Sequence, residues 1–273
     1  MARISLRNVS VELAIYNPRG RALKNEILRR TIGGGVSDDR DRAVILVNAL
    51  RNVSFEARDG DRIGLIGNNG AGKTTLLRVL SKVYPPTAGV VEIQGRVSSL
   101  IDLAMGMDME ATGYENIIMR GVMLGLDHKQ ARSITEEVEA FSQLGQYLSL
   151  PIRTYSSGML LRLAFAVSTA VQPEIAIFDE IIGVGDAGFA ARAKKRIHQL
   201  IQNSNIMFLA SHDNGSIQSF CNRVLWLRGG EIVMDGPPPE VLGAYDDAIA
   251  AAEEVADEET TGELPVTAER AFS

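Results

Sequence analysis

The sequence predicts an α/β fold built around a mainly parallel sheet with helices on both faces. Apolar strand patterns alternate with helical patterns from residue 62 to residue 213, which is typical of such a sheet. A glycine-rich loop, GNNGAGKT at residues 67–74, lies between a strand and a helix, and the strand IAIFDE at residues 175–180 ends in two carboxylates. Because sites in these folds lie at the carboxyl ends of the strands, both features mark a candidate site.

Alternating or continuous apolar positions predict the strands of the first hundred residues. An Asp59-Gly60 turn precedes one strand, and the helix that follows the glycine-rich loop, residues 72–83, is stopped by Pro85 and Pro86. The predicted strands are residues 3–13, 44–57 (one or two strands, with a break near Asn52), 62–66 and 89–95.

Helical patterns dominate the second half of the chain. Helical periodicity covers residues 113–148, and residues 154–171 fit a loop followed by a buried helix. A helix over residues 187–202 then separates the strand that ends in the two carboxylates from a strand at residues 206–213.

The composition predicts a globular domain followed by an acidic tail. Apolar residues make up 45% of the 273 residues, and no apolar run reaches the roughly 18 residues of a membrane-spanning helix. Residues 246–273 hold nine acidic residues and one arginine, so the net charge of -6 leaves +2 for residues 1–245. We expect a domain over residues 1–245, a flexible tail after it, and no nucleic acid partner. The single cysteine, Cys221, points to a reducing cytoplasm.

The glycine-rich loop fits the pattern G-x-x-x-x-G-K-[ST] at every specified position, in the strand-to-helix setting that the pattern requires. Its glycines let backbone N–H groups approach phosphate oxygens at a helix start. We expect Lys73 to reach the β- and γ-phosphates and Thr74 to ligate Mg²⁺, and the alternative is a chance glycine turn. The predicted nucleotide contacts are Gly67, Asn68, Asn69, Gly70, Ala71, Gly72, Lys73, Thr74 and Thr75.

Two strand ends downstream supply the acid–base groups that a phosphate loop lacks. Asp179 is predicted to hold Mg²⁺, directly or through water, and Glu180 to polarise an attacking water. His212, at the end of the next strand, would have its imidazole within reach of a γ-phosphate. The alternatives are a solvated turn for the carboxylates and a structural or exposed histidine.

Five segments in order resemble the ATP-binding subunit of an ABC transporter, over nearly all of residues 1–245. They are GNNGAGKTT, YSSGMLLRLAFAV, IFDE, VGD and SHD. The resemblance implies an ABC-type P-loop ATPase with a RecA-like core, an antiparallel β subdomain and a helical subdomain over about residues 96–170. It also implies ATP and Mg²⁺ as ligands, with Glu180 and His212 as the catalytic groups.

In that family a signature segment caps the ATP held by the other subunit, which implies a homodimer. The segment here is YSSGM, residues 155–159, and it departs from the common form at two positions. Ser156 and Gly158 keep the groups that contact a γ-phosphate across the dimer. Asp186 matches a further contact position, six residues after the predicted catalytic glutamate.

The family segment that usually supplies a glutamine near Mg²⁺ has none in this chain. Asp102 is the nearest candidate and is assigned to the metal. This segment, with TGYEN at residues 112–116 and the YSSGM signature, is similar to the branch that exports lipid-linked polysaccharides. The cargoes of that branch are O antigen, capsule, teichoic acid and cell-wall glycans.

Residues 17–42 form a basic insertion. Within it, RGRALKNEILRR at residues 19–30 would give a short helix an apolar stripe with basic flanks. We predict that this helix meets the anionic lipid or pyrophosphate of a glycan carrier at the membrane surface, and a solvated charged loop is the alternative. Just before the insertion, Tyr16 is predicted to stack on adenine, although Leu13 lies nearer the usual register and an aromatic residue here can also belong to the core.

Together these features predict the ATP-hydrolysing subunit of an exporter for a lipid-linked polysaccharide, for example a galactan. Its expected partners are a polytopic membrane permease and a second copy of this chain, with the glycan as indirect cargo, and its expected location is the cytoplasmic face of the cell membrane. Because the recognisable domain ends near Tyr245, we expect no added carbohydrate-binding domain. The alternatives are a subunit of a small-molecule exporter and a non-transport ABC ATPase that acts on nucleic acid or ribosomes, which the single phosphate loop disfavours.

Overall fold

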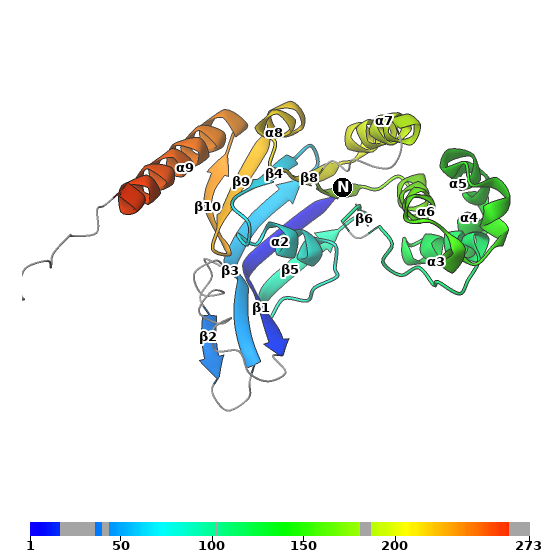
Figure 1. Cartoon of the computed structure of the whole chain (residues 1–273), viewed down its shortest axis with the longest axis horizontal. Coiled ribbons are helices and arrows are strands. Elements are labelled where there is room, and N and C mark those ends of the chain that lie inside the picture. Colours follow the sequence, from blue (N-terminus) through cyan, green and yellow to red (C-terminus); the bar gives the residue numbers. More distant parts are fainter. Residues whose placement is uncertain (17–35, 40–43, 102, 181–186, 262–273) are drawn as a thin grey trace, which may run out of the picture.

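The computed structural model describes residues 1–16, 36–39, 44–101, 103–180 and 187–261. These residues form two sheets that share one hydrophobic core, with a cluster of helices beside them (Figure 1). The predicted α/β fold with an antiparallel part and a helical part is confirmed. The expected basic helix at residues 19–30, together with Asp102 and Asp186, lies outside the described residues.

Six strands form the main sheet, and its central and inner strands run parallel, as predicted. Strands β4, β7 and β8 are buried almost throughout because both faces of the sheet are covered, which explains their continuous apolar runs. Strand β10 runs antiparallel to β9 at one edge. In order across the sheet the strands are β10 (Glu231–Gly236), β9 (Arg223–Arg228), β4 (Arg62–Ile66), β8 (Ile206–Ala210), β7 (Ile175–Asp179) and β6 (Val97–Ser99).

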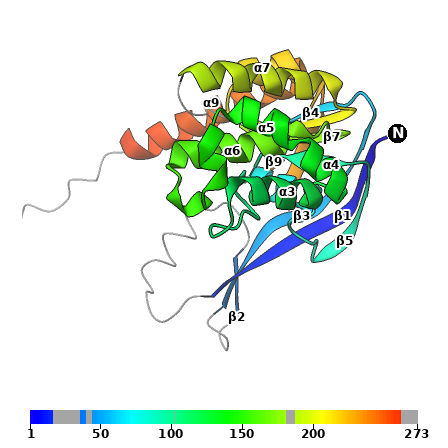
Figure 2. The ribbon, with the colours of Figure 1, turned by 90° about the vertical axis from the view of Figure 1, so that its right-hand side faces the viewer.

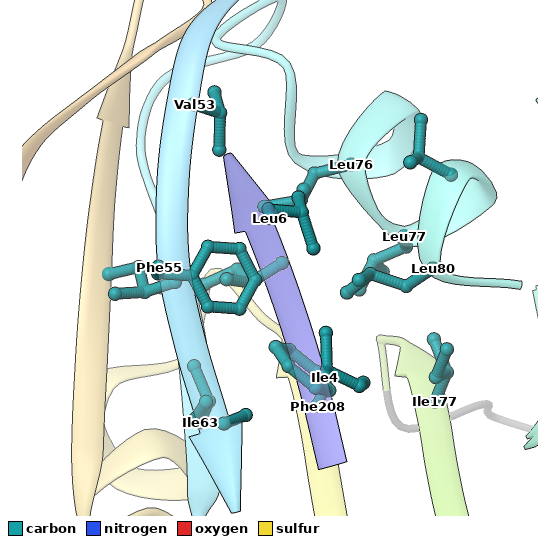
Figure 3. Packing of buried hydrophobic residues seen from close by; sticks show 14 of the residues in the cluster. Ile4, Leu6, Val53, Phe55, Ile63, Leu76, Leu77, Leu80, Ile177 and Phe208 are labelled. Carbon is teal, nitrogen blue, oxygen red and sulfur yellow. The ribbon is translucent and has the colours of Figure 1, made fainter. Parts of the chain in front are cut away.

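Alternate residues of the central strands build two hydrophobic cores, one on each face of the sheet. On one face, Ile63 and Phe208 pack with α2 and with the antiparallel sheet (Figure 3). On the other face, Met207 and Leu209 pack with α7 and α8. The covering helices are α2 (Lys73–Leu80), α7 (Ala187–Asn203) and α8 (Asn214–Phe220).

The antiparallel sheet is built on one long strand, β3. The sequence predicts a break in it near Asn52, but the structure has a bulge there: the register with β1 shifts, and Asn52 has a φ of 48°. Strand β2 lies within the predicted insertion and pairs with β3. In order across the sheet the strands are β2 (Val36–Asp39), β3 (Val44–Arg58), β1 (Arg3–Tyr16) and β5 (Ala88–Gln94).

Short helices form a third core beside the sheets (Figure 2). The helical pattern predicted over residues 113–148 is interrupted after α3, where Gly125 has a φ of 88° and Asp127 caps the next helix. The elements of this helical cluster are α3 (Gly113–Met123), α4 (His128–Ser133), α5 (Thr135–Ser142), η1 (Gly145–Ser149), η2 (Ile152–Thr154) and α6 (Ser157–Ala170).

Two helix ends differ from the prediction. Helix α2 ends at Leu80, earlier than expected, because Lys82 turns the chain into the left-handed region with a φ of 60°. Helix α9 (Pro238–Thr261) continues where the sequence predicts a flexible tail from residue 246. Alanine and glutamate have high helix propensity, so this segment is helical although it has little apolar surface to bury. Within the described part of the chain, no helix has the length and apolar character needed to cross a bilayer.

The TGYEN segment has a structural role at the start of α3. Thr112 Oγ1 accepts a hydrogen bond from the Glu115 N–H, and the Glu115 carboxylate accepts one from the Thr112 N–H, which makes a capping box. Asn116 is fully buried, and its side-chain amide donates to the carbonyls of Asp108, Ala111 and Thr112. Its Oδ1 accepts the Asp108 N–H at 2.9 Å. Asn116 therefore braces the loop at residues 108–112 against the helical cluster.

Replacing Asn116 with alanine is expected to lower the free energy of unfolding by about 2–4 kcal/mol, because it removes a fully buried side chain and leaves partly buried backbone groups of this loop without their partners. Urea unfolding measures the loss. Asn203→Ala, at an exposed position at the end of α7, is the matched control and should change stability by less than about 0.5 kcal/mol. Equal losses in the two variants would contradict the bracing role of Asn116.

Candidate active site

A cleft of about 550 Å³ opens where the phosphate loop, residues 67–74, meets the carboxyl ends of β7 and β8. Its volume is in the range of small-ligand sites, and its place at the strand ends is the one that the sequence predicts. The cleft is lined by most of the loop and by Leu13, residues 47–49, Asp179, Glu180 and His212.

Close backbone contacts fix the path of the phosphate loop. Gly67 has a φ of 139°, and a Cβ at this position would lie 2.2 Å from the carbonyl oxygen of Leu227 in β9. At Gly72, with a φ of 106°, a Cβ would lie 2.7 Å from the carbonyl oxygen of Ala49 in β3. Only glycine lets the loop lie this close to both strands. As a result α2 begins at Lys73 with its N-terminal N–H groups at the cleft.

Lys73 is the buried cation of the cleft. Lys73 is 9% exposed, and its Nζ donates to the carbonyl oxygens of Gly67 and Asn68, the latter at 3.3 Å. Burial lowers the pKa of Lys73, and the carboxylates of Asp179 and Glu180 oppose that effect. A desolvated ammonium of this kind gains from an anionic ligand, which fits a phosphate.

Thr74 and Asp179, the two described residues that were predicted to hold a metal, lie side by side. Thr74 Oγ1 donates to Asp179 Oδ2 at 2.9 Å, although the residues are 105 positions apart. Hydroxyl and carboxylate oxygens are hard ligands, and Mg²⁺ is commonly held by one or two protein oxygens together with water and substrate phosphates. This pair, next to a phosphate loop, therefore fits Mg²⁺.

Glu180 and His212 face each other at the open side of the cleft. Glu180 Oε1 lies 3.8 Å from His212 Nε2, and both side chains are more than half exposed. Glu180 has a φ of 59°, an uncommon value for a residue with a side chain, and its N–H donates to the Ala210 carbonyl at 2.8 Å. This strained turn at the end of β7 places the carboxylate at the cleft.

Ser156 and Gly158 lie at the start of α6, in the helical cluster. Ser156 caps the helix by accepting the Met159 N–H at 3.3 Å, and a Cβ on Gly158 would meet no atom closer than 4.0 Å. Neither residue lines the cleft of its own chain as the structure describes it. The structure thus brings Lys73 to Glu180 and His212, the two predicted catalytic residues, but it does not bring Ser156 and Gly158 to them.

Besides the predicted adenine contact, the site has two parts that were not predicted. The side chain of Tyr16 lies outside the described residues, while Leu13, the alternative adenine contact, lines the cleft. Residues 47–49 form part of the wall, and the Tyr245 hydroxyl donates to Asn68 Oδ1 at 3.0 Å. Neither of these was predicted, because both depend on strand pairing and on the return of α9 to the loop, which no short motif encodes.

A family model described as ABC transporter matches residues 50–183. The chain is 44% identical over 232 residues to the O-antigen export system ATP-binding protein RfbE of Yersinia enterocolitica, which covers 85% of this chain and 97% of that protein. It is 41% identical over 198 residues to the teichoic acids export ATP-binding protein TagH of Lactococcus lactis, which covers 72% of this chain and 42% of that protein.

Among solved structures, the ATP-binding cassette MJ0796, in a dimeric post-hydrolysis state bound to ADP and Pi, matches with a TM-score of 0.60. Its sequence identity is 17%, and the match covers 86% of this chain and 98% of that one, so it shows the fold. The identity to RfbE over nearly all of that protein shows the family. The chain therefore belongs to the ABC transporter family, as an ATP-binding ATPase subunit similar to those of O-antigen and teichoic acid export systems.

Proposed function

We propose that this protein is the ATPase subunit of an exporter for a lipid-linked polysaccharide, such as O antigen, teichoic acid, capsule or a cell-wall glycan. The observation that carries the proposal is the 44% identity to an O-antigen export protein along 97% of its length. The subunit acts at the cytoplasmic face of the cell membrane, bound to a polytopic permease that moves the cargo. Its own work is to bind and hydrolyse ATP.

The phosphates of ATP are held by the phosphate loop, with contacts along residues 67–75. The N–H groups at the start of α2 and the Lys73 ammonium face the β- and γ-phosphates, and burial strengthens this attraction by removing competing water. Thr74 and Asp179 would hold Mg²⁺, which when bound neutralises charge on the phosphates. Leu13 and Tyr16 are the contacts proposed for adenine, and Asp102 is proposed as a further group near the metal.

Glu180 acts as the general base of hydrolysis. Its carboxylate orients a water molecule for attack on the γ-phosphorus and accepts a proton from that water as the bond to the β-phosphate oxygen breaks. The His212 imidazole, on the same side of the cleft and 3.8 Å from Glu180, donates a hydrogen bond to the γ-phosphate. The left-handed backbone of Glu180 directs its carboxylate to the cleft, where it meets the attacking water.

A second copy of the chain completes the site. Ser156 and Gly158 lie outside their own cleft at an exposed helix start, which suits the γ-phosphate of an ATP molecule bound by the other copy. Asp186 is proposed to contact the nucleotide across the same interface. ATP then favours the closed dimer, because these contacts exist only when the two copies meet, and hydrolysis removes them.

The substitution Glu180→Gln is expected to keep ATP binding and to reduce turnover by about a thousandfold, since the amide cannot accept the proton. ATP should then hold the variant as a closed dimer, which size-exclusion chromatography with light scattering detects. Glu136→Gln, at an exposed position in α5, is the matched control and should turn over ATP like the wild type. Full hydrolysis by Glu180→Gln would show that the base lies elsewhere.

Affinity purification from membranes of the producing cell tests the transport role. We expect a polytopic membrane protein to copurify with this chain and to change its ATPase rate, because an exporter couples hydrolysis to its permease. The Glu180→Gln variant in the presence of ATP should retain this partner as well. Recovery of no polytopic partner, together with an ATPase rate that membranes do not alter, would exclude the exporter role.

A further inference from the structure

Helix α9 contacts the phosphate loop through one side chain. The Tyr245 hydroxyl donates to Asn68 Oδ1 at 3.0 Å, a bond between residues 177 positions apart. The predicted site includes Asn68, but it assigns no role to Tyr245. In Figure 1, α9 lies against β9 and β10 and extends away from the body of the protein. The bond therefore connects the phosphate loop with a projecting helix.

Asn68 is the residue through which this contact reaches Lys73, the proposed phosphate-binding lysine. Its carbonyl oxygen accepts from Lys73 Nζ at 3.3 Å and from the Ala71 N–H at 3.0 Å. The position of Asn68 therefore affects the turn of the loop and one of the two hydrogen bonds of the ammonium to the loop carbonyls. Because Asn68 is exposed, little packing fixes its side chain, and a hydrogen bond from a firmly held neighbour has more effect there than in a packed core.

Tyr245 is such a neighbour. Its ring meets the ring of Trp226 edge to face, with 5.5 Å between the centroids, and Val241 and Leu242 bury the preceding turn of α9 in the core. Trp226 in β9 pairs with Ile66, the residue directly before the phosphate loop. The Tyr245 hydroxyl is therefore held relative to the same strand from which the loop starts.

We propose that Tyr245 is a positioning residue that holds the phosphate loop through Asn68 and makes the start of α9 respond to the nucleotide. The proposal rests on the proposed ATP site. A phosphate that attracts Lys73 Nζ weakens the hydrogen bonds of the ammonium to the loop carbonyls. The hydrogen bond from the Tyr245 hydroxyl then contributes more to fixing the position of Asn68. Nucleotide binding then shifts the Tyr245 ring against Trp226.

Nucleotide affinity is the first readout. Tyr245→Phe removes the hydroxyl and keeps the ring, and we expect it to weaken ADP and ATP binding about fivefold, the effect of one ordinary hydrogen bond. It should raise the KM for ATP more than it lowers kcat. Asn68→Ala should weaken binding to a similar extent, and the double variant should be no weaker than either single variant, because both remove the same bond. Tyr147→Phe, an exposed tyrosine in η1, is the matched control.

Fluorescence is the second readout and does not require turnover. Trp226 is the single tryptophan of the chain, so its emission reports on the ring contact with Tyr245. Titration with ADP should change this emission in the wild type and in Tyr147→Phe, and the change should be reduced by at least half in Tyr245→Phe and in Asn68→Ala. This result would show that the hydrogen bond from Tyr245 to Asn68 transmits the effect of nucleotide binding from the phosphate loop to Trp226.

The outcomes separate this proposal from the ATP site itself. If the wild type binds ATP and Lys73→Ala does not, but Tyr245→Phe matches the wild type in affinity and emission, the role of Tyr245 is excluded and the ATP site stands. Additive losses in the double variant would likewise exclude it. If Lys73→Ala binds ATP as tightly as the wild type, the ATP site is misplaced and both proposals fall.

Discussion

The close approach of the phosphate loop to two strands is the constraint on which the active site depends. Gly67 lies against β9 of the main sheet, and Gly72 lies against β3 of the antiparallel sheet, at distances that exclude a Cβ. The loop therefore joins both sheets and fixes where α2 begins. From that point Lys73 enters the cleft, and Thr74 reaches Asp179 on β7.

The division of the molecule into sheets and a helical cluster keeps Ser156 and Gly158 apart from the cleft of their own chain. The cluster has its own core, and the buried Asn116 braces the loop at its edge, so Ser156 is presented on a structured helix start away from the cleft. In the proposed dimer, the site would close only when the two copies meet. Closure of this proposed dimer would couple ATP binding to movement of the membrane permease.

The sequence was sufficient to predict the sheet, its parallel strands and the grouping of Lys73, Asp179 and His212, because strand ends and a glycine-rich loop are local signals. It did not predict the early end of α2, since no pattern marks Lys82 as left-handed, nor the helical course of α9 after residue 246, where charge suggested a flexible tail. The contact of Tyr245 with the loop was also missed. Contacts between elements distant in sequence depend on packing, which motifs do not encode.

Mixing two inactive variants tests directly whether the ATP site is shared between two copies. Lys73→Ala removes a phosphate contact, and Ser156→Asp keeps a cap for α6 but places negative charge against the γ-phosphate. Each variant alone should be inactive, because every site of its homodimer contains the defect. A mixed dimer has one site with both defects and one with neither, so mixing should restore ATP hydrolysis. A mixture as inactive as its two components, or full activity of Ser156→Asp alone, would contradict a shared site.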